Sequence, residues 1–254
     1  MTNILIFILG LLIGSFLNAI IYRLEKKESF LLGRSHCPYC RKVLKWHDLA
    51  PLLSFILLLG KCRYCRKKIS PQYPIVELAT GLLFVLIVNK FLSVGLLITG
   101  YWLLVAGYLI IIFAYDLKHY IIPDKIIYPA IIIAGIFNFQ FSIFNQFSIF
   151  QFSIWSALGA SVFFLSLVLI SQGRWMGWGD VKMAFLMGLI LGWPNILVAL
   201  FLSFFSGAVV GVILILAGKK KMKSEIPFGP FLAGSTIFVM LFGSFISFPI
   251  DIIF

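Results

Sequence analysis

Long apolar runs alternate with short polar segments along almost the whole chain. Eight such runs are visible, at residues 3–22, 75–89, 93–114, 126–139, 155–171, 183–193, 196–217 and 230–250. An α-helix needs roughly 20 apolar residues to cross a bilayer, and most of these runs approach that length. The pattern therefore predicts an all-α polytopic membrane protein with about eight transmembrane helices. The two shortest runs, 75–89 and 183–193, are expected to be tilted or partly re-entrant.

The composition leads to the same class of protein. Of the 254 residues, 61% are hydrophobic and 12% are charged, and the mean hydropathy is +1.06. A soluble domain is usually about half apolar and about a quarter charged. One water-soluble core cannot bury such an excess of apolar side chains, so the bilayer has to be the solvent for most of the chain.

The basic residues lie between the apolar runs. Of the 21 Lys and Arg residues, 20 fall in four segments, at 23–74, 115–125, 172–182 and 218–229. Lys and Arg accumulate in the cytoplasmic loops of membrane proteins. The distribution predicts that the N-terminus lies outside and these four segments lie inside. The net charge of +12 follows this topological pattern, so we do not expect nucleic acid as a partner.

The long polar segment after the first run divides the chain. We expect a first transmembrane helix at 1–22, a cytoplasmic cysteine-bearing loop at 23–74, and a transmembrane domain at 75–254. A second unusual stretch, at 138–154, reads NFQFSIFNQFSIFQFSI and repeats a Phe- and Gln-rich unit without charge. It is expected to form a lengthened external loop or an interfacial segment on the outer leaflet, and it has no assigned function.

Two aspartates stand at cytoplasmic ends of predicted transmembrane helices. Asp116 closes the third run, and Asp180 shortly precedes the sixth. Ionisable residues at membrane depth are costly and usually functional. The topology places both carboxylates on the same face, where one can take a proton from water while the other protonates a peptide carbonyl. Gly177 and Gly179 precede Asp180 and would leave room for a substrate backbone beside its carboxylate.

Structural roles compete with this interpretation. Asp116 and Asp180 could only cap helices or pair with Lys118 and Lys182. Capping does not suit Asp116, because a negative charge at a helix C-terminus opposes the helix dipole. Asp180 could cap its helix and still be catalytic. Asp124 opens the fourth run, and an N-cap role is favoured there.

Four cysteines form two Cys-x-x-Cys pairs in the cytoplasmic loop. Cys37 pairs with Cys40 and Cys62 with Cys65, and 21 residues separate the pairs. Stable disulfides are not expected in the cytoplasm. Four thiolates in two pairs suit a tetrahedral, structural zinc ion, although the separation slightly exceeds the usual range of about 15 to 20 residues. The alternatives are thiols without metal or two independent redox pairs, which here lack a thioredoxin-like context.

Taken in order, the motifs of this chain resemble those of the type IV prepilin peptidases, a bacterial family related in motif to the Gly-x-Gly-Asp intramembrane aspartyl proteases. The matching segments are GSFLNAIIYRL (14–24), CPYC (37–40), WHDLAPLLSF (46–55), CRYCRKKISPQYPIVELATG (62–81), DLKHYIIPD (116–124), GWGDVKM (177–183) and IPFGPFLAG (226–234). The resemblance assigns the catalytic role to Asp116 and Asp180, with Gly177, Gly179 and Lys182 in support.

The resemblance also implies an activity and its partners. Such enzymes lie in the bacterial inner membrane and cut the short basic leader from type IV prepilins and type II secretion pseudopilins. They cut after a glycine, on the cytoplasmic side, and many also methylate the new N-terminus with S-adenosylmethionine. The cysteine loop accompanies these bifunctional members. No Rossmann-type glycine fingerprint follows a predicted strand, so the residues that would bind S-adenosylmethionine stay unknown.

Other classes of protein remain to be weighed against a peptidase. A transporter or channel could use paired aspartates to relay protons or bind cations, but it predicts inverted repeats and polar residues through the mid-membrane. The apolar runs consist almost entirely of Leu, Ile, Phe and Val. A membrane assembly factor with a zinc-stabilised docking loop gives no reason for two aspartates on one face. A third alternative is a related protease that cuts some other small membrane protein, and only a substrate assay distinguishes it from a prepilin peptidase.

Overall fold

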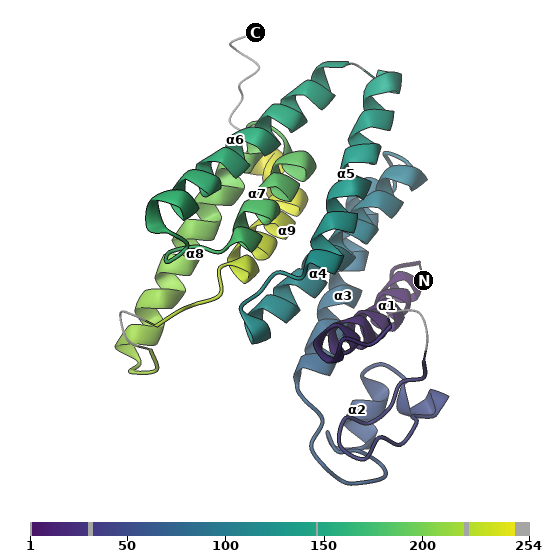
Figure 1. The fold of residues 1–254 in the computed structure, drawn as a ribbon. Coiled ribbons are helices and arrows are strands. Elements are labelled where there is room, and N and C mark those ends of the chain that lie inside the picture. Colours follow the sequence, from purple (N-terminus) through teal and green to yellow (C-terminus); the bar gives the residue numbers. More distant parts are fainter. Residues whose placement is uncertain (1, 30–32, 146, 221–223, 247–254) are drawn as a thin grey trace. The chain divides into compact units, whose positions relative to one another are not determined.

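The structure, a computed structural model, describes residues 2–29, 33–145, 147–220 and 224–246, which are predominantly helical (Figure 1). The long helices of these ranges are α1 (Thr2–Lys26), α3 (Gln72–Phe91), α4 (Leu96–His119), α5 (Asp124–Asn145), α6 (Phe147–Ser171), α7 (Trp178–Leu191), α8 (Asn195–Leu216) and α9 (Gly229–Ile246). A 3-10 turn at Trp46–Asp48 and the short helix α2 (Leu53–Leu57) lie between α1 and α3. The described residues contain no named β-strand, so the predicted all-α class is confirmed.

Each of the eight predicted apolar runs lies largely within one of the long helices. Among the described residues, five helices are long and apolar enough to cross a membrane: α1, α3, α4, α8, and α6 from Ser153 onward. Part of α9 is a shorter apolar helix. The chain is therefore a multi-pass membrane protein, whereas a total of eight transmembrane passes stays a prediction.

The Phe- and Gln-rich stretch at 138–154 differs from one of its two expected forms, a lengthened external loop, while an interfacial segment stays a prediction. α5 continues to Asn145 and α6 begins at Phe147, while Gln146 lies outside the described residues. The described part of the stretch is therefore helical, not an extended loop. The physical reason is that the repeat contains neither Pro nor Gly, the residues that most often end a helix.

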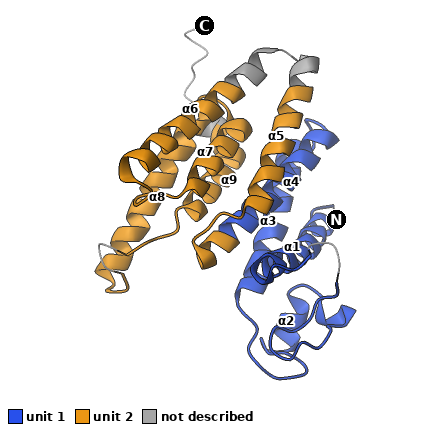
Figure 2. Cartoon of the chain, in the orientation of Figure 1, with its two compact units in different colours: residues 1–114 blue, residues 115–254 orange. Residues whose placement is uncertain are grey.

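The chain divides into two compact units, residues 1–114 and residues 115–254 (Figure 2). In unit 1, α1 and α3 pack side by side and antiparallel through small residues. A Cβ added to Gly10 would lie 2.7 Å from the Cα of Gly81, and one added to Gly14 would lie 2.7 Å from the Cα of Glu77. Small residues let two backbones approach this closely, which is a common device between membrane helices.

Glu77 also connects this helix pair to the cysteine loop. Its side chain is buried in α3, and one carboxylate oxygen accepts the backbone N–H of Leu52 at 2.9 Å. Nothing in the sequence indicates a partner for this carboxylate. Asn18 of α1 adds a bond to the backbone carbonyl of Tyr73 at 3.0 Å. The bond from Leu52 fixes the loop to α3, and the bond from Asn18 joins α1 to the start of α3.

In unit 2, α7 is the central helix. Met183, Leu186 and Met187 are almost completely buried, and Gly188 lies directly against the backbone of Ala157 in α6. α7 packs against α5, α6, α8 and α9. With 14 residues it is about 21 Å long, too short to cross roughly 30 Å of hydrocarbon alone. Protein surrounds most of this helix from Asp180 to Ile190, whereas Gly177 and Trp178 at its start are exposed.

Candidate functional site

Asp180 lies in the first turn of α7. Gly177 precedes the helix in an extended conformation, and its backbone N–H donates to the Asp180 carboxylate at 3.0 Å. Asp180 is therefore a capping residue, as the sequence allowed, and only 9% of it is exposed. The N-terminus of a helix carries partial positive charge, so it stabilises the ionised form of a carboxylate placed there.

The two glycines beside Asp180 have different surroundings. A Cβ added to Gly179 would lie 3.1 Å from the Cβ of Ile122, which is buried in the segment that joins α4 to α5. Gly179 thus lets the first turn of α7 pack closely against the chain that follows Asp116. A Cβ added to Gly177 would lie 3.9 Å from Asp180 Oδ2, an ordinary van der Waals distance, and Gly177 itself is exposed.

Asp116 lies in the last turn of α4, and 4% of it is exposed. Its carboxylate faces the N-terminus of α9, where it accepts the backbone N–H of Gly229. A Cβ added to Gly229 would lie 2.5 Å from Asp116 Oδ2 and 3.0 Å from its Cγ. Sequence analysis did not single out Gly229, although the segment IPFGPFLAG that contains it was among the family motifs.

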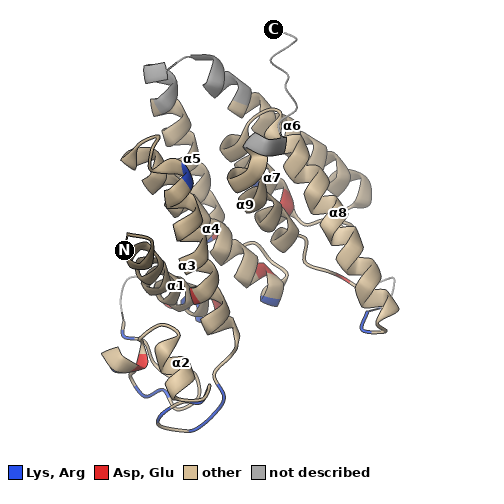
Figure 3. Ribbon diagram, turned by 180° about the vertical axis from the view of Figure 1, so that it is seen from behind, with Lys and Arg blue, Asp and Glu red and all other residues tan. Residues whose placement is uncertain are grey.

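The structure brings the two aspartates together within unit 2. Acidic residues mark the end of α4 and the start of α7 in Figure 3. The carboxylates of Asp116 and Asp180 lie close enough for their charges to interact, and both are buried. Each also faces a helix N-terminus, α9 for Asp116 and α7 for Asp180. Two interacting buried carboxylates of this kind can share one proton, which is the arrangement that acid–base hydrolysis of a peptide needs.

Lys182, one turn along α7, contacts residues of α5. Its ammonium lies 2.5 Å from Asp124 Oδ1 and 4.8 Å from the centre of the Tyr128 ring, both in α5. Asp124 is itself the first residue of α5, so it lies one position inside the helix instead of at the expected N-cap. The Asp124–Lys182 pair therefore ties the beginnings of α5 and α7 to each other.

The four cysteines of unit 1 form a compact cluster. Their sulfur atoms all lie within 4.8 Å of one another, and those of Cys37 and Cys65 are 3.8 Å apart. Zinc–sulfur bonds of about 2.3 Å in a tetrahedron put neighbouring sulfurs about 3.8 Å apart. The cluster therefore fits a tetrahedral metal, and the zinc-binding interpretation of the sequence is compatible with this geometry.

Two similar hairpins supply the sulfurs. In residues 36–43 and 61–68, a backbone bridge closes each hairpin, and the residue after the second cysteine adopts a positive φ. Each hairpin also presents a lysine to the tyrosine ring of the other, Lys42 over Tyr64 at 4.6 Å and Lys67 over Tyr39 at 4.7 Å. The sequence shows the same internal repeat, because CPYCRK (37–42) corresponds to CRYCRK (62–67). Sequence analysis did not identify this repeat.

The backbone of each hairpin affects the ionisation of its first thiol. Burial raises the pKa of Cys37 to about 11, even though N–H groups of Cys40 and Tyr39 oppose this shift. Burial acts in the same direction on Cys62, but the N–H groups of Cys65 and Tyr64 and the neighbouring thiols lower its pKa to about 7. A bound cation would favour the thiolate form throughout the cluster.

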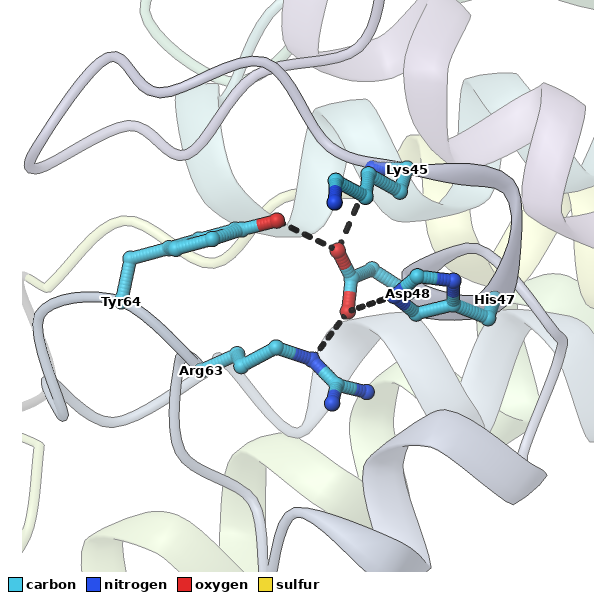
Figure 4. A network of polar contacts seen from close by, with 5 residues as sticks. All are labelled: Lys45, His47, Asp48, Arg63 and Tyr64. Atoms are coloured by element: carbon cyan, nitrogen blue, oxygen red, sulfur yellow. Dashed lines mark hydrogen bonds and ion pairs between the residues drawn. The ribbon is translucent and has the colours of Figure 1, made fainter.

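Asp48 holds the second hairpin in place (Figure 4). Its side chain is only 3% exposed and accepts the Nε–H of Arg63 at 2.6 Å, the Tyr64 hydroxyl at 3.2 Å and the Lys45 backbone N–H at 3.2 Å. Burial alone would raise the pKa of Asp48, but these donors, Arg63 first, lower it overall. Arg63 and Tyr64 lie between the two cysteines of that hairpin, so Asp48 fixes it independently of metal.

Comparison with known proteins places these features in a family. Residues 8–91 match the bacterial peptidase A24 N-terminal domain, and residues 102–212 match the type IV leader peptidase family. A prepilin leader peptidase/N-methyltransferase of Bacillus subtilis is 33% identical over 252 residues, which cover 97% of each chain. A protein of the same name from Stutzerimonas stutzeri is 31% identical and covers 93% of this chain and 89% of its own.

A third relative of that name, from Myxococcus xanthus, is 34% identical over 223 residues. The match covers 84% of this chain but only 63% of that relative. No solved structure matches the chain.

Proposed function

This chain belongs to the type IV leader peptidase family, and from that premise we propose that it is a prepilin peptidase whose catalytic carboxylates are Asp116 and Asp180. Its substrates would be type IV prepilins or type II secretion pseudopilins, cut after a glycine at the cytoplasmic face of the inner membrane. One observation carries the assignment of the site. Two buried, interacting aspartates lie in one unit, each against a helix N-terminus.

The proposed reaction uses one ionised and one protonated carboxyl. The ionised carboxylate takes a proton from water as the water oxygen attacks the carbonyl carbon, and the protonated carboxyl gives its proton to the carbonyl oxygen. When the tetrahedral intermediate collapses, the C–N bond breaks and one hydroxyl of the intermediate returns its proton to the second carboxylate. The leaving amine takes the proton that the first carboxylate had gained. Because the two groups exchange roles, the pair and not either residue governs the pH profile.

The neighbouring residues take supporting roles in this proposal. The exposed Gly177 has no side chain beside the Asp180 carboxylate, so a substrate backbone can approach this carboxylate. Gly179 permits the close packing that brings α7 to the segment after Asp116. Lys182 acts at a distance, because its contacts with Asp124 and Tyr128 hold α7 against α5.

The orientation in the membrane is also part of the proposal. The positive segments identified in the sequence lie at the ends of described helices, for example after α8 (Figure 3). With those segments in the cytoplasm, Asp116 and Asp180 face the cytoplasm and the N-terminus lies outside. A basic leader that stays in the cytoplasm then meets the carboxylates at that face, while the apolar part of the substrate stays in lipid.

The cysteine loop has a structural role in the proposal. Cys37, Cys40, Cys62 and Cys65 would hold one zinc ion, which supplies folding free energy to a loop with little core of its own. Relatives that match this chain are named peptidase/N-methyltransferases, so methylation of the new N-terminus is the second proposed activity. S-adenosylmethionine would be the methyl donor. The residues of this chain that would bind it stay unassigned.

Co-expression with a prepilin tests the proposal. Mass spectrometry of the pilin N-terminus should show loss of the leader and gain of one methyl group with the wild-type enzyme. Asp116→Asn and Asp180→Asn should each leave the leader attached, because an amide cannot transfer the proton. Asp124→Asn serves as the matched control and should still cut.

Two outcomes would overturn the proposal. The first is cleavage by either of the two catalytic-site variants while both are inserted normally. The second is intact prepilin with the wild-type enzyme when the same preparation cuts another small membrane protein.

A further inference from the structure

The segment that leads into α9 has an unusual relation to Asp116. The backbone carbonyl of Phe228 accepts the first helical hydrogen bonds, from Phe231 at 3.0 Å and Leu232 at 3.2 Å. Gly229 is therefore the first residue inside the helix, and its N–H has no acceptor within α9. Pro230 follows and has no N–H to offer. Gly229 thus supplies the first available donor of this helix, and Asp116 accepts it.

The space between the two residues leaves no room for a side chain. The nearest atoms to a Cβ built on Gly229 are Oδ2, Cγ and Cβ of Asp116, at 2.5, 3.0 and 3.3 Å. Gly229 is not among the glycines with positive φ, so its backbone conformation suits other residues. The closest contacts that exclude a side chain here are therefore those with Asp116.

A cluster of aromatic rings anchors the same segment. Phe228 lies between rings of two other helices, 6.2 Å from that of Phe164 in α6 and 5.1 Å from that of Phe204 in α8. Phe164 is completely buried. A Cβ added to Gly207 of α8 would lie 3.5 Å from both Phe228 and Phe231, so these rings also rest directly on the α8 backbone. The first turn of α9 is therefore fixed by contacts that do not involve Asp116.

We propose that Gly229 is a positioning residue for catalysis, which seats the Asp116 carboxylate against the N-terminus of α9 because it has no side chain. Phe228 holds this seat in place through the aromatic cluster. The inference rests on the proposed function, in which Asp116 is catalytic. It adds that α9, and not only α4, determines where this carboxylate lies.

The two aspartates then use the same physical device in different ways. Asp180 caps the helix to which it belongs, so its position is set within α7. Asp116 lies at the end of α4, where its own helix dipole is unfavourable, and it uses the N-terminus of a helix more than 100 residues later. Gly229 is the point at which the two segments meet.

The test compares Gly229→Ala with Gly135→Ala, the same substitution at a position in α5 where an added Cβ meets nothing within 4 Å. Prepilin cleavage is followed in membranes, and kcat and KM are separated. A displacement of a catalytic group by about 1 Å can lower the rate on the order of 100-fold. Gly229→Ala should therefore lower kcat by about that factor with KM nearly unchanged, whereas Gly135→Ala should match the wild type.

A variant that fails to fold would still inform the proposal. Asp116→Ala removes the atoms with which the new methyl group would collide most severely. The double variant Asp116→Ala/Gly229→Ala should therefore unfold at a temperature close to that of Asp116→Ala alone, even where Gly229→Ala unfolds earlier than the wild type. Such coupling is expected of residues in direct contact and not of distant, independent sites.

The outcomes separate this inference from the proposed function. Cleavage by Gly229→Ala within twofold of the wild type, with Asp116→Asn inactive, overturns the positioning role and leaves the catalytic pair intact. A destabilisation by Gly229→Ala that is equally large in the Asp116→Ala background also overturns it. Full activity of Asp116→Asn would instead reject the catalytic assignment on which the inference rests.

Discussion

Replacing Lys182 with alanine tests whether this lysine positions α7 or takes part in the chemistry. Its side chain is 26% exposed and that of its partner Asp124 is 61% exposed. Ion pairs exposed to this degree contribute roughly 0.2 to 1 kcal/mol. The contact with the Tyr128 ring adds about 0.5 to 1 kcal/mol. The variant should therefore lose at most about 2 kcal/mol of stability.

The effect on the rate follows from the same magnitude. If all of that free energy were lost from the transition state, cleavage would slow by about 30-fold at most, since each 1.36 kcal/mol is tenfold. Asp124→Ala removes only the ion pair and should slow cleavage by less than about fivefold. Because the two residues form one pair, the double variant should show a smaller loss than the two single losses combined.

The assay is the initial rate of prepilin cleavage in membranes, with thermal unfolding of the purified variants in detergent. Lys182→Arg is the conservative control and should keep most of the rate. The reasoning is refuted if Lys182→Ala cannot cut while Asp124→Ala cuts at the wild-type rate. That result would place the ammonium in contact with the substrate or the catalytic carboxylates.

Three further predictions concern the loop and the topology. Elemental analysis should find about one zinc per chain in the wild type, and the double variant Cys37→Ser/Cys40→Ser should lose it. The same variant should impair methylation more than cleavage. A metal-free wild type with four titratable thiols contradicts this prediction. Asp48→Ala should speed zinc loss to a chelator, whereas Lys45→Ala, which keeps its backbone N–H, should match the wild type. A reporter fused after Lys220 should read cytoplasmic and one fused within 138–154 external, and the reverse would exclude the proposed orientation.

Features set by local pattern could be predicted from the sequence. The apolar runs predicted the long helices, because a transmembrane helix must be long and apolar whatever its neighbours are. The spacing within each Cys-x-x-Cys pair gave the metal-like cluster, because a short hairpin brings both sulfurs together. The cap at Asp180 was also visible, since Gly177 lies only three residues away.

Features that join distant segments could not be predicted in this way. More than 100 residues separate Asp116 from Gly229, and no periodicity records their contact. The Asp48 network combines a loop turn with a later hairpin, and its partners are common surface residues. Contacts divide the chain after Ala114, within α4, and the divisions after residues 22 and 74 that the sequence indicates stay a prediction.

The short central helix connects these observations. An α-helix of 14 residues cannot cross a full bilayer alone, and the first turn of α7 buries Asp180 in unit 2 beside the exposed Gly177 and Trp178. In a medium of low polarity the partial charge of a helix N-terminus acts more strongly on a carboxylate than it does in water. The same environment makes a second nearby negative charge costly. Two carboxylates can therefore be held close together and differ in protonation. Three features contribute to this arrangement: the short helix α7, the burial of both aspartates and the glycine at the start of α9.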